Sequence, residues 1–312
     1  MYDNGGGEQN RTSEKTDMAI EVHSEVIDQV PVASATVMVV RDGPGGLEVL
    51  MVRRSGQAGV LGGAYVFPGG KLDESDGQVS PQWIDLSLQQ CRERLGEDGA
   101  TAEDAVGLHV AALRETFEEC GLLLGLPGKD ELVPLVQAAT AAGQGFGDAV
   151  HALGSSLAVS SVVPWSRWIT PRMASMTRKR FDTRFFVAAA PEGQEAVHDN
   201  HEATEAVWLT PRAAMERYWD GGMDMAPPQL MSLCELGAMD SVSQVMAFAR
   251  GRLPIQIEPH PFDEDGCRVI CYPGDPAHPQ AQPVWKGPTR VTHRNRRFEP
   301  EGGLEALLSR TG

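Results

Sequence analysis

Basic side chains are scarce in this chain of 312 residues. The sequence holds 27 Lys and Arg against 43 Asp and Glu, which gives a formal net charge of −16 at pH 7. A general nucleic-acid binder relies on Lys and Arg to contact phosphate, so this balance argues against nucleic acid as a partner. A small phosphorylated ligand remains compatible with it, because bound metal ions can supply positive charge locally.

Long apolar runs and a disulfide framework are also missing. No uninterrupted apolar stretch approaches the roughly 20 residues needed to span a bilayer, so we expect no membrane partner. The segment from Met1 to Lys15 is polar and glycine-rich, without the apolar core of a signal peptide. Five cysteines are an odd number for so long a chain, which favours a reducing compartment and predicts a cytoplasmic protein.

Acidic side chains crowd the end of one predicted helix. Thr101 to Asp104 has the spacing of a capping box, and Gly121 is a natural helix stop, so a helix is predicted between them. Its last turn holds the carboxylates of Glu115, Glu118 and Glu119. The helix dipole favours cations at this end. One interpretation is a solvated face on which Arg114 pairs with Glu118. The other is a divalent cation site, because Mg²⁺ and Mn²⁺ prefer carboxylate oxygen.

A second motif precedes this helix. Phe67-Pro68-Gly69-Gly70 is followed by Asp76, and the two glycines allow the backbone to approach a ligand closely. Together with Arg-Glu-x-x-Glu-Glu-x-Gly-apolar over 114–122, this pattern resembles the Nudix box. Two departures are visible: Asp76 stands where the family has Glu, and positions 77 to 113 replace a spacer of seven residues. Such an insertion resembles the coenzyme A diphosphatase (nudix-type motif 19) subgroup of the family.

Arginines upstream of the box point to phosphate. Arg54, Ser55, Gly63 and Phe67 fall in register with a motif of coenzyme A pyrophosphatases, while Gly59 stands where that motif has a second Arg. We expect Arg53, Arg54 and Phe67 to contact substrate, because Arg offers a fork of donors to phosphate. The ordinary alternative for the arginines is an exposed strand end. The basic run Arg178-Lys179-Arg180 is either a solvated loop or a further phosphate contact, and Arg180 is its candidate.

The resemblance implies a fold and a division of the chain. It predicts an α/β protein, the Nudix α/β/α sandwich with a mixed sheet, carrying a helical insertion and a small C-terminal β-rich extension. The expected units are a flexible leader over 1–30, the Nudix domain over 31–250 with its insertion over 77–100, and the extension over 251–312.

The resemblance also implies a reaction. It predicts metal-dependent hydrolysis of a diphosphate bond in a nucleoside diphosphate linked to another group, with coenzyme A or an acyl-coenzyme A as the first choice. Mg²⁺ or Mn²⁺ would be held by Glu115, Glu118, Glu119 and Gly70. Glu118, Glu202 and Arg114 are the predicted catalytic residues, with Glu205 as an alternative to Glu202. A homodimer is an open alternative to the monomer.

Three other functions remain open at this point. The first is another Nudix substrate, such as ADP-ribose, NADH or a dinucleoside polyphosphate. The second is a Nudix-like sensor that binds a nucleotide without cleaving it. The third is a scaffold in which the C-terminal arm is the functional part.

Local patterns predict individual elements. A hairpin of two strands is expected from apolar, β-branched runs on either side of a glycine-rich turn. Helix starts are expected at Ser80-Pro81 and after Pro227-Pro228. His109 is expected to be a packing or surface residue, and Cys267 and Cys271 ordinary thiols. The expected strands are 34–40, 47–53, 159–163, 181–188, 255–258, 268–272 and 289–292, and the expected helices are 80–95, 101–120, 130–142, 211–218 and 229–250.

Overall fold

The computed structural model describes residues 25–56, 61–173 and 179–309. A mixed sheet of eight strands crosses the molecule in the order β3-β2-β1-β6-β5-β8, with β4 paired to β1 and β7 paired to β2. β1 runs parallel to β6, and β5 runs parallel to β8, while the other pairs are antiparallel. The strands are β1 (Val32–Gly43), β2 (Gly46–Arg54), β3 (Tyr65–Val66), β4 (Gly69–Lys71), β5 (Val163–Ile169), β6 (Phe181–Ala189), β7 (Ala203–Leu209) and β8 (Ile255–Ile257).

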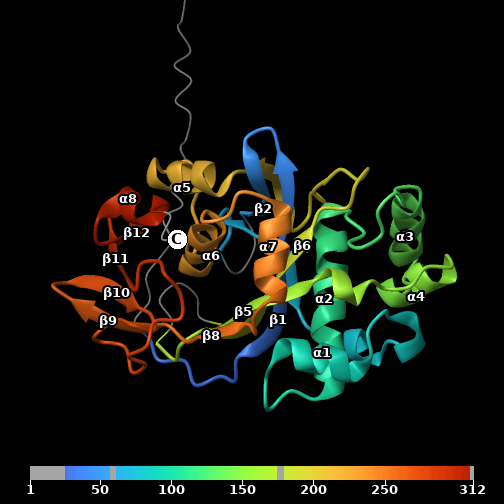
Figure 1. Ribbon diagram of the computed structural model, residues 1–312, viewed down its shortest axis with the longest axis horizontal. Coiled ribbons are helices and arrows are strands. Elements are labelled where there is room, and N and C mark those ends of the chain that lie inside the picture. Colours follow the sequence, from blue (N-terminus) through green and yellow to red (C-terminus); the bar gives the residue numbers. More distant parts are fainter. Residues whose placement is uncertain (1–24, 57–60, 174–178, 310–312) are drawn as a thin grey trace, which may run out of the picture.

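Both faces of this sheet are buried. Successive side chains of a strand point to opposite faces, so Val37 and Val39 of β1 enter one core while Met38 and Val40 enter the other. The first core is covered by α1 (Leu88–Leu95), α2 (Ala102–Cys120), α3 (Leu132–Ala141) and α4 (Phe146–Ala152). The second is covered by α5 (Pro211–Trp219), α6 (Pro227–Leu236) and α7 (Val242–Arg250). The expected α/β/α sandwich with a mixed sheet is therefore confirmed (Figure 1).

The central helix α2 begins and ends as its sequence predicts. Thr101 Oγ1 accepts from the backbone N–H of Asp104, and the Asp104 carboxylate accepts from the N–H of Thr101. Gly121 ends the helix with φ +68°, a conformation that other residues rarely adopt. The last turn of α2, which carries the acidic side chains, lies beside β4.

Two predicted helices are each broken in two. The predicted helix over 80–95 is a 3-10 turn at Pro81–Trp83 followed by α1, because Ile84 bridges to Leu157 and Ser87 caps a new helix start. The predicted helix over 229–250 is α6 and α7, because the chain leaves the helix after Leu236 and Ser241 caps α7. In both places a serine inside the predicted helix accepts from the backbone N–H three residues on.

The strand predicted over 159–163 is also wrong. Val159–Ser161 form a 3-10 turn, and strand β5 begins only at Val163. β5 then runs to Ile169. The other expected strands have counterparts in the structure, as do the helices expected over 101–120, 130–142 and 211–218.

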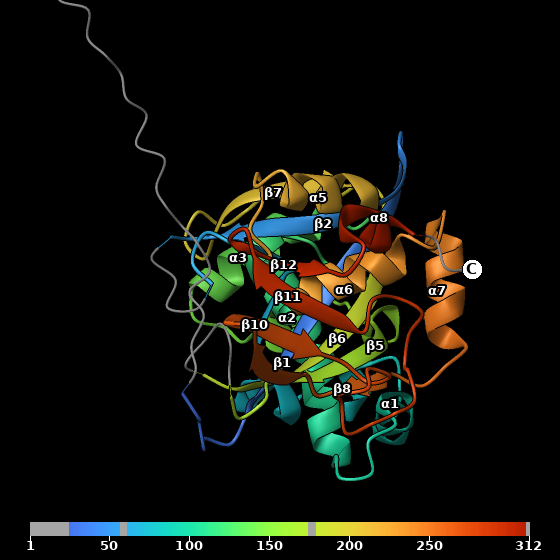
Figure 2. The same ribbon diagram turned by 90° about the vertical axis from the view of Figure 1, so that its left-hand side faces the viewer.

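The C-terminal extension forms a second sheet and shares the core of the first. Its strands are ordered β12-β11-β10-β9, all antiparallel, and a short helix α8 (Gly303–Leu308) follows. These strands are β9 (His260–Glu264), β10 (Cys267–Cys271), β11 (Arg290–Arg294) and β12 (Arg297–Pro300). Figure 2 shows this side of the molecule toward the viewer. Ile270, Val291 and Phe298 belong to the same buried cluster as α5 and α6. The extension's first strand, β8, pairs with β5 of the main sheet.

Some residues named in the sequence analysis lie outside the residues that the structure describes. Gly59, Arg178 and the first 24 residues of the predicted leader are not among the described residues. Within the described ranges, no helix has the length and apolar character needed to cross a membrane. The boundaries predicted at residues 30 and 250 stay predictions.

One hydroxyl ties the extension to α5, which yields a test. Tyr218 Oη donates to the backbone carbonyl of Phe298 at 2.9 Å and accepts from its N–H at 2.8 Å. Tyr218→Phe leaves both buried backbone groups without a partner, and we expect it to lower the free energy of unfolding by about 1–3 kcal/mol. Chemical denaturation measures this change.

Tyr272→Phe is the matched control. Tyr272 is as deeply buried, but its hydroxyl has no hydrogen-bond partner within the described residues. We expect this variant to be as stable as the wild type or more stable. An equal loss in both variants would contradict the bridging role of Tyr218.

Candidate active site

A buried ion pair joins the end of α2 to the turn after β4. Arg114 Nε and Nη2 each donate to a carboxylate oxygen of Asp76 at 2.9 Å, and Nη2 also donates to the Lys71 carbonyl at 3.0 Å. Asp76 is 2% exposed. The aspartate that replaces the family's glutamate therefore still reaches the arginine, in the bidentate geometry that makes such pairs strong.

The three glutamates of α2 surround this pair in different ways. Arg114 Nη1 donates to Glu115 Oε1 and to Glu118 Oε2, both at 2.8 Å. Glu119 is 3% exposed, and its Oε2 accepts from the backbone N–H of Gly69 at 3.0 Å. The pairing of Arg114 with Glu118 is present, but Glu119 is buried and Glu115 is partly buried, so this end of α2 is more than a solvated face.

Two glycines bring the backbone of β4 against β1 and α2. A Cβ on Gly69 would lie 2.4 Å from the carbonyl oxygen of Ala35, and one on Gly70 would lie 2.4 Å from the Glu115 carboxylate. Thr36 Oγ1 is directed to the carbonyls of Phe67 and Pro68, at 3.1 and 2.9 Å, which anchors the start of the turn. A larger residue at 69 would push β4 away from β1, and a larger residue at 70 would displace the Glu115 carboxylate.

The three glutamates have raised pKa values. Burial is the largest cause, and together with the neighbouring carboxylates it raises the pKa of Glu119 to about 8 and that of Glu115 to about 7. The pKa of Glu118 is also raised, first by burial. Arg114 opposes the shift at Glu115 and Glu118 but is shared with Asp76. A divalent cation would supply the missing charge, and carboxylate oxygens are the donors that Mg²⁺ and Mn²⁺ prefer.

The donor set suits such an ion, although its side chains are engaged elsewhere. Among the residues that the structure describes, no three acidic, His or Cys side chains already converge as a metal site. Glu115 and Glu118 are turned toward Arg114, and Glu119 toward Gly69. The carboxylates are of the right type and lie on one helical turn, so they fit the ion expected from the sequence.

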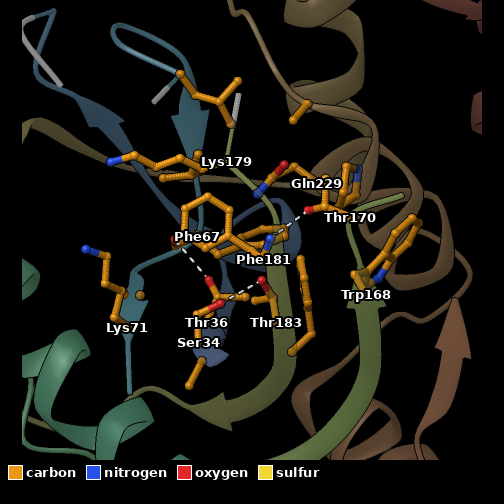
Figure 3. A pocket seen from close by; sticks show the side chains of 18 of the residues that line it. Ser34, Thr36, Phe67, Lys71, Trp168, Thr170, Lys179, Phe181, Thr183 and Gln229 are labelled. Carbon is orange, nitrogen blue, oxygen red and sulfur yellow. Dashed lines mark hydrogen bonds between the residues drawn. The ribbon is translucent and has the colours of Figure 1, made fainter. Parts of the chain in front are cut away.

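A cavity of about 670 Å³ opens from this cluster. Its acidic end is lined by Glu115, Glu118 and Glu202, with Arg54 and Gly70 beside them. Its other end is apolar and runs past Phe67 to Trp168 (Figure 3). A volume of this size suits a small-molecule ligand.

The predicted site residues do not all reach this cavity. Arg54 and Phe67 line it. Arg53 and Arg180 are not among the described residues that line the cavity. Arg53 Nε donates to the Gly63 carbonyl at 3.3 Å, and Arg180 donates to the carbonyls of Thr170 and Gln29. Lys179, the neighbour of Arg180, lines the cavity in its place. Substrate contacts by Arg53 and Arg180 stay predictions.

Glu202 and Glu205 are separated by their surroundings. The carboxylate of Asp199 accepts from the backbone N–H groups of His201, Glu202 and Ala203, which fixes the loop that presents Glu202 to the cavity. Glu205 lies on β7 and accepts from Tyr65 Oη at 2.7 Å. The arrangement favours Glu202 over Glu205 as the acid that faces a ligand.

His109 has no place in this site. It is fully buried in α2, with Nδ1 2.7 Å from the Ala105 carbonyl, and burial lowers its pKa to about 4. The expectation of a packing histidine is confirmed.

Several lining residues escaped sequence reasoning. Gln229 at the start of α6, Lys71 beside Gly70, and Pro259, Pro261 and Ile270 of the extension all line the cavity. Lys71 could have been suggested by its position next to Gly70. No sequence pattern links the other four to the Nudix box, because they come from elements more than 100 residues away in the chain.

Comparison with known proteins supports the resemblance. The family model described as the NUDT19 Nudix domain matches residues 89–236. A chicken (Gallus gallus) protein named acyl-coenzyme A diphosphatase NUDT19 is 27% identical over 300 residues, covering 80% of this chain and 77% of that protein. The human protein of the same name is 27% identical over 246 residues, covering 66% and 65%.

A solved structure agrees with these sequence matches. The crystal structure of a Nudix hydrolase from Alicyclobacillus acidocaldarius superposes with a TM-score of 0.55 at 26% identity, covering 73% of this chain and 98% of that one. Together these matches support a Nudix hydrolase. This Nudix hydrolase resembles the NUDT19 subgroup.

The raised pKa values of the Nudix hydrolase predict how metal and pH affect its stability. Without metal, Glu115 and Glu119 have folded-state pKa values near 7 and 8, above the ordinary 4.5. Their contribution to stability is therefore full below pH 4.5 and is lost as the pH rises through 7 to 8. A cation needs the ionised carboxylates, so we expect Mn²⁺ to raise the Tm more at pH 8 than at pH 6.

Thermal unfolding at the two pH values, with Mn²⁺ or with EDTA, measures this effect. Glu119→Gln removes one of the titrating groups and is expected to flatten both the pH dependence and the response to Mn²⁺. A wild-type Tm that responds equally to Mn²⁺ at both pH values would contradict the assignment.

Proposed function

We propose that this Nudix hydrolase cleaves the diphosphate bond of coenzyme A or of an acyl-coenzyme A. The observation that carries the proposal is the cavity that joins the acidic cluster to an apolar end near Trp168. A diphosphate next to the glutamates would leave this apolar end for an attached group that is largely apolar. The names of the chicken and human relatives point to the same substrate class.

Glu115, Glu118 and Glu119, with the backbone carbonyl of Gly70, would hold Mg²⁺ or Mn²⁺ in this proposal. When bound, such an ion neutralises charge on phosphoryl oxygens and makes a water more acidic. Binding requires Glu115 and Glu118 to turn from Arg114 Nη1. Arg114 stays in place meanwhile, because Asp76 and the Lys71 carbonyl hold the rest of its guanidinium.

Arg54 is the side chain proposed to hold the diphosphate. It lines the acidic end of the cavity, and its Nε is buried without a hydrogen-bond partner among the described residues. A buried donor left unpaired costs free energy, which a phosphate oxygen would recover. Burial raises the pKa of Glu119, and the positive charge of Arg54 opposes this rise, so Arg54 already acts on the cluster.

Glu202 is proposed as the general base, with Glu118 as the alternative. Glu202 lines the cavity together with Glu115 and Glu118, on a loop held by Asp199. A carboxylate there can accept a proton from the water that attacks phosphorus. Arg114 would hold Glu115 and Glu118 in place until a cation binds, rather than contact the reacting atoms.

A substrate panel tests the reaction. Purified protein is incubated with Mg²⁺ or Mn²⁺ and coenzyme A, an acyl-coenzyme A, NADH, ADP-ribose or a dinucleoside polyphosphate, and the products are identified by mass spectrometry. We expect 4′-phosphopantetheine, or its acyl form, and adenosine 3′,5′-bisphosphate, and no product in EDTA. A higher kcat/KM on ADP-ribose or NADH would overturn the coenzyme A assignment, and metal-dependent binding without any cleavage would favour a sensor.

Glu119→Gln tests the acidic cluster. The amide can still accept from the Gly69 N–H, so the fold should survive, while one charged oxygen donor is lost. We expect kcat to fall by about 100-fold or more, because loss of an outer partner of a metal ligand alone costs 10- to 100-fold.

Glu103→Gln is the control, since Glu103 is an exposed residue in the first turn of the same helix. Steady-state kinetics in saturating Mg²⁺ compares the two variants. A near-normal rate for Glu119→Gln would remove Glu119 from the site.

The cytoplasmic location and the homodimer stay predictions.

A further inference from the structure

The apolar end of the cavity is built by two sheets and one helix start. Trp168 of β5 and Phe185 of β6 form its floor on the main sheet, and Pro261 and Ile270 close it from the C-terminal extension. Pro227 and Pro228 at the first turn of α6 form another side. We call this region, lined by these six residues, the apolar chamber.

The hydroxyl groups near the chamber are already engaged. Ser34 Oγ and Thr183 Oγ1 pair with each other at 2.7 Å. Thr170 Oγ1 accepts from the backbone N–H of Phe181 at 3.0 Å, and Thr36 Oγ1 is directed to the carbonyls of the Phe67-Pro68 turn. These side chains therefore add little unpaired polarity to the wall.

Gln229 is the exception. It lies in the first turn of α6, is 8% exposed and lines the cavity. Its Oε1 is buried without a hydrogen-bond partner among the described residues. Figure 3 shows its side chain reaching from α6 toward Thr170 and Phe181, in the middle of the pocket. Burying an unpaired amide oxygen costs free energy unless a partner arrives.

We propose that Gln229 is a specificity-determining residue whose Oε1 accepts a hydrogen bond from an amide N–H of the substrate. The ligand group that suits the apolar chamber is a mostly aliphatic chain carrying an N–H donor. This inference rests on the proposed function, because the chain that joins the diphosphate to the thiol in coenzyme A carries secondary amides.

A nucleobase is the alternative occupant of the chamber. Adenine presents a ring nitrogen beside its amino group, and the Nε2 and Oε1 of one glutamine amide can pair with both. A chain amide needs only the acceptor, Oε1, which is the buried atom without a partner among the described residues. A chain amide can give its N–H to Gln229 while its aliphatic neighbours contact Trp168 and Ile270. A site built to pair with an N–H rejects ligands that lack one, because its own polar group then stays unpaired.

The test separates the two halves of the substrate and needs no turnover. Isothermal titration calorimetry on the full chain with Mg²⁺ measures the Kd of 4′-phosphopantetheine, the amide-bearing half, and of adenosine 3′,5′-bisphosphate, the base-bearing half. The variants are Gln229→Met, which keeps an unbranched side chain of similar length, and Gln229→Leu, which also lacks the acceptor. Gln89→Met on the exposed face of α1 is the matched control.

We expect both Gln229 variants to raise the Kd of 4′-phosphopantetheine about three- to tenfold, the scale of one hydrogen bond between neutral groups. The Kd of adenosine 3′,5′-bisphosphate is expected to change less than that. The Tm of the variants should not fall, because Oε1 has no partner to lose within the described residues. A structural residue would instead lower the Tm.

Three results would overturn the proposal. They are an unchanged Kd for 4′-phosphopantetheine in both variants, an equal or larger loss on the base-bearing half, and no binding of the amide-bearing half by the wild type. Failure of the proposed function is a different observation, namely no metal-dependent cleavage of coenzyme A by the wild type.

Discussion

The site depends on one buried ion pair. Arg114 is held by both oxygens of Asp76 and by the Lys71 carbonyl, and its remaining nitrogen reaches Glu115 and Glu118. Two charges removed from water are retained only when their geometry and hydrogen bonds are nearly complete, as they are here. The pair fixes the end of α2 against β4, and therefore fixes where the carboxylates stand relative to Gly69 and Gly70.

That constraint gives the acidic cluster its chemical character. Side chains with raised pKa values and a shared cationic partner are poised to exchange that partner for a metal ion. The same burial is unfavourable for the folded protein while no cation is bound. The rest of the cavity differs from the acidic cluster. It is mostly apolar and is lined in part by the C-terminal extension. Among the described residues, Oε1 of Gln229 is buried there without a hydrogen-bond partner. The acidic side chains and the apolar side chains thus line different parts of one cavity.

Local signals succeeded where the physics is local. The cap at Thr101, the stop at Gly121 and the hairpin of β1 and β2 depend on neighbouring residues, and each was predicted. The two long helices were wrong at their interruptions: Ser87 and Ser241 each cap a new helix inside the predicted span. Tertiary contacts then decided between continuation and interruption, as the bridge between Ile84 and Leu157 shows.

The sequence by itself determined the acidic turn, the glycines that face it and the superfamily, because those residues are close in the chain or carry a recognisable spacing. Only the tertiary structure decided that Lys179 rather than Arg180 lines the cavity, that Arg53 turns to Gly63, and that β8 completes the main sheet. It also decided that Gln229 and Ile270 share a wall with Trp168. Cavities are made by residues distant in sequence, and no local propensity or spacing specifies which of them will meet.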